Sequence, residues 1–96
     1  DLLIKANGSV VSMTALNMHS DVYRNVMKSQ FYQDTPGKVE LRIVPTREYS
    51  QSDSDEIIRQ LQEKLGPEMD ITVILKNDIP LNKNGKAKIV DQRISL

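Results

Sequence analysis

Three lysines lie close together near the end of the 96-residue sequence, in the stretch IPLNKNGKAKIVD at 79–91. Lys86 directly follows Gly85, whose lack of a Cβ lets the backbone turn without a steric clash. An ammonium group on a loop hinged in this way is a suitable point charge for a carboxylate or phosphate oxygen. On residue types alone, an ordinary solvated turn explains the same pattern, and it is the commoner case.

Other residues that could carry chemistry are sparse. The chain has one histidine and no cysteine, which excludes disulfides, thiolate metal ligands and cysteine nucleophiles. His19 has no serine elbow to accompany it, so we interpret it as a surface or edge histidine. The acidic run at 53–56 lacks the glycine and distal glutamate of a calcium loop and fits the first turn of a helix better. We therefore expect no metal site.

The charge balance limits the partners that the chain can bind. Thirteen basic and thirteen acidic side chains cancel, and the chain has no Trp and one Phe. A broad nucleic-acid footprint, a polybasic membrane anchor and an aromatic platform for single strands are therefore not expected. No apolar run approaches about 18 residues and no signal peptide is visible, so we expect no membrane span and a cytoplasmic location.

The first part of the chain predicts a hairpin followed by a helix. Apolar residues flank Asn7 and Gly8, and both residue types tolerate the positive φ of a short turn, so we expect a β-hairpin at 2–11. Ser12 is a possible N-cap, and apolar residues recur at helical spacing after it. A helix is therefore expected within 14–25.

A second hairpin is expected at 28–44. Its turn at 34–37 combines proline and glycine, which preset and permit the backbone angles of a tight turn. The second arm alternates apolar residues with Glu40 and Arg42, which indicates a strand with one solvated face. Pro45 cannot donate to a strand ladder, so it should end this strand.

The strongest helix signal lies at 49–70. Ser52 and the acidic residues after it resemble a capped first turn, in which negative charge favours the helix dipole. Gly66 suits the left-handed position after a helix, and Pro67 prevents continuation. One apolar stripe is formed by Ile57, Ile58, Leu61 and Leu65.

A strand of β-branched residues at 70–75 completes the pattern. The order β-β-α-β-β-α-β predicts a single α+β domain over 1–96. We expect an N-terminal β-hairpin followed by a small, mainly antiparallel sheet with two helices on one face.

Taken together, the two ends of the chain resemble the adenylate-forming superfamily of acyl-CoA synthetases, peptide-synthetase adenylation domains and luciferases. DLLIKANGSVVSMTALN at 1–17 resembles the segment that follows the hinge of these enzymes, and IPLNKNGKAKIVDQRI at 79–94 resembles their terminal Gly-Lys motif. The resemblance is greatest to the phenylacetate–CoA ligase family and its capsule-polysaccharide-synthesis relatives, whose helix start resembles TALN at 14–17. It covers essentially the whole chain.

This resemblance implies the C-terminal lid domain of an ATP-dependent acid–CoA ligase, whose partner is the N-terminal adenylation domain of the same chain. Such enzymes form an acyl-adenylate and pyrophosphate from a carboxylic acid and MgATP, and then transfer the acyl group, usually to coenzyme A. The lid rotates between the two steps. The resemblance also implies that this domain alone binds no cofactor and is inactive, with ATP, Mg²⁺ and coenzyme A as co-substrates of the full enzyme.

The resemblance also assigns roles to individual residues. Lys86 matches the lysine that binds carboxylate and phosphate oxygens during adenylation, with Gly85 in the same substrate and nucleotide loop. Asp1 matches the second aspartate after the Gly-Arg of the hinge region, so the chain is expected to be a fragment whose hinge residue lies just before it. The hairpin residues that would line the pantetheine channel are Asn7, Gly8 and Ser9.

Departures from the family pattern keep alternatives open. Val10 stands where many acyl-CoA synthetases have arginine, Asn17 where glutamate is common, and Ile89 where an arginine often follows the lysine. These changes fall mainly on the transfer step, so an adenylating enzyme with an acceptor other than coenzyme A is one alternative. A free-standing α+β binding or regulatory module is another. Nucleic-acid binding is a weaker one, through Lys83, Lys86, Lys88 and Arg93.

Overall fold

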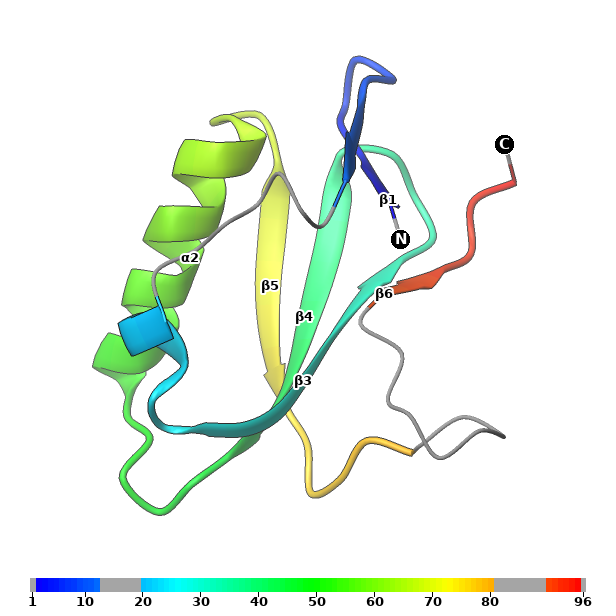
Figure 1. Cartoon of the computed structure of the whole chain (residues 1–96). Coiled ribbons are helices and arrows are strands. Elements are labelled where there is room, and N and C mark those ends of the chain that lie inside the picture. The colour runs from blue at the N-terminus through cyan, green and yellow to red at the C-terminus, as the bar shows by residue number, and fades with distance from the viewer. Residues whose placement is uncertain (1, 13–19, 81–89, 96) are drawn as a thin grey trace.

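The computed structural model describes residues 2–12, 20–80 and 90–95, which form an α+β domain (Figure 1). The predicted fold class is therefore confirmed. In chain order, the described elements are β1 (Leu2–Ile4), β2 (Val10–Ser12), the 3-10 helix η1 (Ser20–Tyr23), β3 (Val26–Gln33), β4 (Lys38–Pro45), α2 (Gln51–Leu65), β5 (Asp70–Leu75) and β6 (Val90–Gln92).

Four strands form the main sheet, in the order β5-β4-β3-β6. β3 and β4 pair antiparallel, whereas β6 runs parallel to β3 and β5 runs parallel to β4. The sheet is therefore mixed rather than mainly antiparallel as expected. The reason lies in the connections, because α2 carries the chain from the end of β4 back to the starting end of its neighbour β5, so these two strands point the same way.

The β3–β4 hairpin forms where it was predicted, and its first arm is longer than expected. Phe31 pairs with Leu41, and β3 begins at Val26 with an irregularity in the pairing near that end. Gly37 in the turn has a φ of 80°, a left-handed value that glycine adopts without strain. β4 ends at Pro45, as its missing N–H group requires.

The α2 helix confirms the strongest prediction, with its cap two residues earlier than expected. Ser50, not Ser52, occupies the N-cap in an extended conformation, and its N–H donates to the Asp53 carboxylate at 2.9 Å. This bond is the largest cause of the lowered pKa of Asp53, followed by a bond from Asn25. At the other end, Gly66 has a φ of 96° and its N–H donates to the carbonyl of Gln62.

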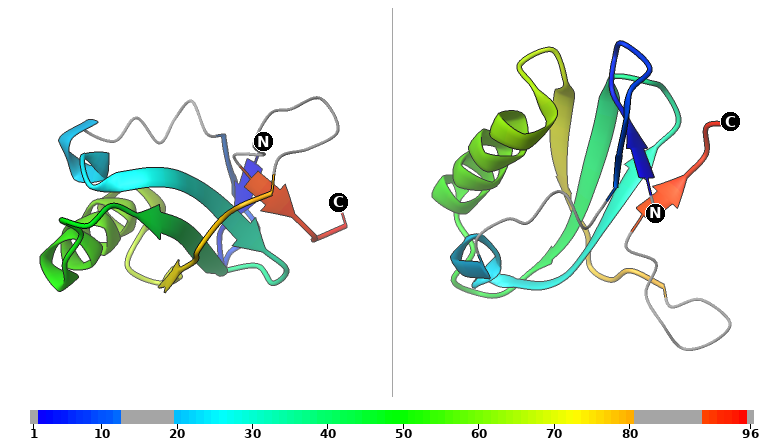
Figure 2. Two further views of the ribbon diagram at one scale, coloured as in Figure 1. Left: turned by 90° about the horizontal axis from the view of Figure 1, so that it is seen from below. Right: turned by 45° about the horizontal axis from the view of Figure 1, so that its top comes forward.

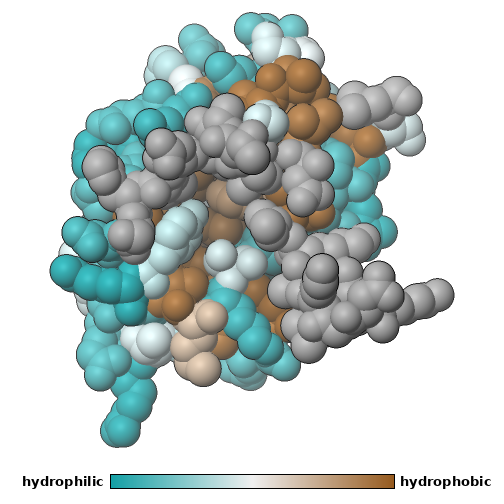
Figure 3. Space-filling view, in the orientation of Figure 1, coloured by the Kyte–Doolittle hydropathy of each residue, from teal (hydrophilic) through white to brown (hydrophobic). Residues whose placement is uncertain are grey.

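The core lies between the sheet and the elements that cover one of its faces. Leu61 of α2 and Leu41 and Ile43 of β4 are fully buried. Val22 of η1 and Leu3 of β1 belong to the same cluster, so the helices and the hairpin cover the same face. Figure 2 shows α2 and η1 on one side of the molecule and the hairpin with β6 on the other. The outer side formed by α2 is largely hydrophilic (Figure 3).

The helix expected within 14–25 is only partly inside the described residues, because 13–19 lie outside them. The described remainder is the short 3-10 helix η1, and β3 begins soon after it, at Val26. Among the described residues, α2 is thus accompanied by a 3-10 helix instead of a second α-helix. A further strand, β6, forms after the last strand of the expected order β-β-α-β-β-α-β.

The β1–β2 hairpin rests directly on the turn between β3 and β4. The N–H of Gly37 donates to the carbonyl of Ile4 at 3.0 Å, and the Gly37 carbonyl accepts from the N–H of Asp70 at 2.8 Å. A Cβ placed on Gly37 lies only 2.9 Å from the Cβ of Ala6 and 3.0 Å from its Cα. Glycine at this position therefore serves both the turn and the close approach of the hairpin.

Substituting Gly37 and Gly8 by alanine separates these two requirements. Both glycines have positive φ, but a Cβ on Gly8 has no neighbouring atom within 4 Å. Gly8→Ala should lower the free energy of unfolding by about 1–2 kcal/mol through backbone strain alone. Gly37→Ala should lower it by a further amount of about 1–3 kcal/mol, because Ala6 must move. Chemical denaturation measures both, and equal losses would contradict a tight contact with Ala6.

Candidate functional site

The residues with the strongest predicted role lie outside the described residues. This applies to Lys86 and Gly85 in 81–89 and to Asp1. His19, interpreted as a surface or edge histidine, also lies outside them. The described part of the predicted site is the hairpin loop with Asn7, Gly8 and Ser9 and the residues that flank 81–89.

The hairpin loop is stabilised by its own hydrogen bonds, and its tip is exposed. The N–H of Lys5 donates to the carbonyl of Ser9 at 2.8 Å, and the N–H of Gly8 donates to the carbonyl of Lys5 at 2.9 Å. The Asn7 side chain accepts from the N–H of Ser9 at 2.9 Å, which closes the turn locally. Gly8 has a φ of 87°, so the predicted need for glycine here is confirmed. The loop thus presents a defined, exposed surface at its tip.

A pocket of about 320 Å³ lies where this loop faces the end of α2. Loop residues and residues at the end of α2 and just after it line this pocket together. Its lining residues are Lys5, Ala6, Asn7, Leu65, Gly66, Glu68 and Met69.

The base of the hairpin is held by Gln33, a buried glutamine at the end of β3 that is 1% exposed. Its Oε1 accepts from the N–H of Ile4 at 2.8 Å, and its Nε2 donates to the carbonyl of Ile4 at 2.8 Å. The same Nε2 also donates to the carbonyl of Lys38 at 3.0 Å. Gln33 thereby acts toward β1 as the backbone of a neighbouring strand would.

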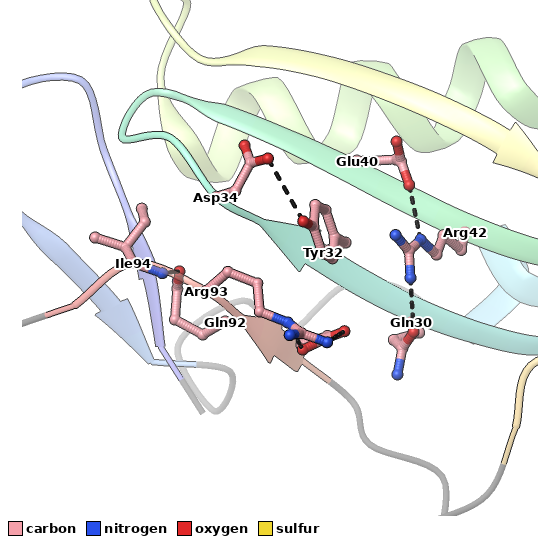
Figure 4. Close-up of polar contacts among 9 residues, drawn as sticks. Gln30, Tyr32, Asp34, Glu40, Arg42, Gln92, Arg93 and Ile94 are labelled. Atoms are coloured by element: carbon pink, nitrogen blue, oxygen red, sulfur yellow. Dashed lines mark hydrogen bonds and ion pairs between the residues drawn. The ribbon is translucent and has the colours of Figure 1, made fainter.

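Gln92 of β6 completes this network. Its Nε2 donates to Oε1 of Gln33 at 2.7 Å and to the carbonyl of Leu2 at 2.9 Å. Its Oε1 accepts from the N–H of Ile94 at 3.0 Å, a contact drawn in Figure 4. Every donor and acceptor of the Gln33 amide is then used, which removes the penalty of about 1–3 kcal/mol that each unsatisfied buried polar group carries.

The segment 81–89 is flanked on both sides by residues anchored to β3. Before it, the Asp78 carboxylate accepts from Nζ of Lys28 at 2.8 Å, and Ile79 is 2% exposed. After it, Val90 is buried and pairs with Phe31. A groove of about 410 Å³ lies beside the Lys28–Asp78 ion pair, lined partly by exposed apolar side chains of β3 and β5.

The second face of the sheet is polar around Tyr32, Glu40 and Arg42. The guanidinium of Arg42 lies 4.2 Å from the centroid of the Tyr32 ring and forms a 2.7 Å ion pair with Glu40. It also donates to the amide oxygen of Gln30 at 3.5 Å (Figure 4). The predicted solvated face of β4 is thereby confirmed, and its charges are paired with one another.

The described residues give no indication of a metal centre. Across 2–12, 20–80 and 90–95, no three acidic or histidine side chains gather closely enough to hold a metal ion. None of the helical segments in these ranges has the length and apolar character needed to cross a membrane.

The sequence did not single out Gln33 and Gln92. The one available signal was alternation, because Gln33 shares the face of the buried Phe31 and is therefore a polar residue at a core position. No local pattern indicates that its partner lies 59 residues away on β6.

Comparison with known families matches the chain to a family described as the CapK C-terminal domain. Its profile covers residues 3–93, nearly the whole chain. A comparison with curated proteins finds no matching relative. The family match agrees with the resemblance to capsule-polysaccharide-synthesis relatives, and its description indicates a domain of a larger CapK protein.

The Lys28–Asp78 contact can be tested by titration. The hydrogen bond from Lys28 is the main cause that lowers the pKa of Asp78, with a smaller contribution from the N–H of Ile79. A lowered carboxyl pKa stabilises the fold above the ordinary aspartate value of about 4, and this contribution is lost as the pH falls through the lowered value. In Lys28→Met, NMR titration should show the Asp78 pKa moving back up toward the ordinary value.

Asp53 is the internal control for this titration, because its pKa is lowered by Ser50 and Asn25 and not by Lys28. Its pKa should be the same in both proteins. An unchanged Asp78 pKa in Lys28→Met would contradict the ion pair.

Proposed function

Because the chain belongs to the CapK C-terminal domain family, we propose that it is the lid domain of an adenylate-forming acid–CoA ligase of the phenylacetate–CoA ligase type. The full enzyme converts a carboxylic acid and MgATP to an acyl-adenylate and pyrophosphate. It then transfers the acyl group to a thiol, coenzyme A in the simplest case. The lid contributes to both steps and rotates between them.

One arrangement in the structure carries this proposal. The β1–β2 hairpin extends past one end of the sheet, whereas residues 76–80, which lead to 81–89, leave β5 at the opposite end (Figures 1 and 2). A domain that supplies a lysine in one pose and a channel-lining hairpin in another requires two separate surfaces of this kind. A module that binds a single partner has no such need.

The role of Lys86 rests on its charge and on the anchoring of its neighbours. Its ammonium compensates negative charge on the carboxylate and phosphate oxygens as the acyl–phosphate bond forms and pyrophosphate leaves. Val90 follows it by 90 − 86 = 4 residues, which span at most about 14 Å when fully extended. Because Val90 is buried in the sheet, this length limits how far Lys86 can lie from an anchored residue.

The partner of this domain is the N-terminal adenylation domain of the same protein. That domain must hold the acid and ATP in the reactive geometry, since a lysine positioned by a lid accelerates only a substrate that is already oriented. The isolated lid is accordingly inactive. The paired charges of Glu40 and Arg42 suit a surface that docks reversibly, because a large apolar surface would hold one pose.

Val10 favours a second candidate for the acceptor. It stands where many acyl-CoA synthetases have arginine, and it is 53% exposed at the start of β2. A valine cannot pair with a phosphate of coenzyme A, so an adenylating enzyme with another acceptor is the alternative. Thioester formation measured with coenzyme A and the activated acid distinguishes the two acceptors.

Lys86→Ala tests the adenylation step in the full-length parent protein. Acid-dependent ATP–pyrophosphate exchange should fall by roughly 10²-fold or more, the loss typical of removing one group that stabilises transition-state charge. Lys83→Ala is the matched control, since it removes a lysine from the same stretch and should leave the exchange rate unchanged. Wild-type exchange in Lys86→Ala would remove the assigned role. An equal loss in both variants would indicate a general effect of charge.

Gly8→Trp tests the transfer step separately. The space around Gly8 is open, so the indole projects outward and should block the pantetheine channel while the domain stays folded. Acyl transfer from the preformed adenylate should be lost, and ATP–pyrophosphate exchange should be retained. Gly8→Ala carries the same backbone strain without the bulk and should retain both activities. Loss of both steps in Gly8→Trp would count against a hairpin that faces the channel.

A further inference from the structure

The two ends of the described chain meet at one network of side-chain amides, formed by the buried Gln33 and the half-buried Gln92. Gln33 binds both backbone groups of Ile4, and Gln92 binds the carbonyl of Leu2. The two amides are bonded to each other at 2.7 Å. Strand β1 is thereby fixed to β3 and β6 through glutamine side chains, although among the described strands it pairs with β2 alone.

The backbone determines how each amide is oriented. Ile4 offers one donor and one acceptor, so Oε1 of Gln33 must face its N–H and Nε2 must face its carbonyl. Nε2 of Gln92 must then face Oε1 of Gln33, which leaves Oε1 of Gln92 for the N–H of Ile94. Only one arrangement satisfies all of these groups, so the network specifies a single position of β1 relative to β6.

The backbone of β6 strengthens this link. The N–H of Arg93 donates to the carbonyl of Gln33 at 2.7 Å, and Gln92 pairs with Gln33 in the parallel register of β3 and β6. Gln33 thus holds β6 by its backbone and β1 by its side chain. A displacement of either strand breaks hydrogen bonds at a position that water does not reach, since Gln33 is 1% exposed.

We propose that Gln33 and Gln92 are positioning residues that join the N-terminal hairpin and strand β6 into one rigid unit. The hairpin loop follows β1, and β6 follows the Gly-Lys stretch in the sequence. The two glutamines therefore set the base of the hairpin with respect to the strand that follows the Gly-Lys stretch. Their role in the two half-reactions rests on the proposed ligase function, whereas their role in joining the strands does not.

The inference is tested with Gln92→Leu and Gln33→Leu in the full-length parent protein. Gln60→Leu is the matched control, because Gln60 is buried and its described hydrogen bond goes to Glu56 within α2. The first readout is amide hydrogen exchange resolved to single residues. The amides of Ile4 and Ile94 should exchange roughly tenfold faster or more in Gln92→Leu, with the amides of α2 unchanged. Gln33→Leu should have the same effect on Ile4, and Gln60→Leu should leave both amides at wild-type rates.

The second readout is kinetic and is taken below the melting temperature of every variant. Misplacing both ends should lower the kcat of ATP–pyrophosphate exchange and that of acyl transfer, each by roughly 10-fold to 10²-fold, with KM unchanged. A general loss of stability lowers the melting temperature but does not lower kcat while the protein is folded. Loss of both steps also differs from the pattern expected for a variant of Lys86 or Gly8, which affects one step.

Each outcome has a distinct meaning. Wild-type rates of amide hydrogen exchange at Ile4 and Ile94 in Gln92→Leu would overturn the inference, whatever the rates of the two half-reactions. Faster amide hydrogen exchange, with adenylation and acyl transfer both at wild-type rates, would overturn the positioning role. A wild-type parent protein that lacks acid-dependent ATP–pyrophosphate exchange would overturn the proposed ligase function and leave the hydrogen-exchange result as a test of the amide network. Gln92→Leu keeps the inference testable if Gln33→Leu does not fold.

Discussion

The buried amide of Gln33 is the constraint on which the arrangement of this domain depends. A polar group so deeply buried is destabilising unless its hydrogen bonds are complete, and its partners come from β1, β4 and β6. The position of each of these strands is therefore set by the same side chain. The tight approach of Ala6 to Gly37 acts in the same direction, because it leaves the hairpin little freedom at its base.

Strand β3 contacts both the base of the β1–β2 hairpin and the residues that flank the Lys86 stretch, the two regions that the proposed function requires. It pairs with β4 and β6, and its Gln33 binds the base of the hairpin. At its other end, Lys28 binds Asp78 just before the stretch that contains Lys86. A lid must move as one body, since a catalytic group that shifts relative to the docking surface loses its orientation. Anchoring both functional regions to one central strand fulfils that requirement within a small domain.

The two faces of the sheet differ in chemistry and therefore in use. One face is closed by the apolar side of α2, by η1 and by the hairpin, and it provides the core. The other carries Arg42 stacked on Tyr32 and paired with Glu40. A face with paired charges is compatible with water when it is exposed, and its polar groups can form directional contacts when another domain covers it. Both properties suit the alternating contacts of the proposed lid.

The sequence by itself determined the features that depend on neighbouring residues. The Asn7-Gly8 turn, the end of β4 at Pro45 and the buried stripe of α2 were predictable because they follow from backbone angles, missing donors and helical spacing. Lys86 was singled out by its motif and stays a prediction. Only the tertiary structure decided the parallel pairing of β6, the mixed sheet and the Gln33–Gln92 network. These join residues up to 90 positions apart, and a glutamine carries no local sign of which distant backbone will satisfy its amide.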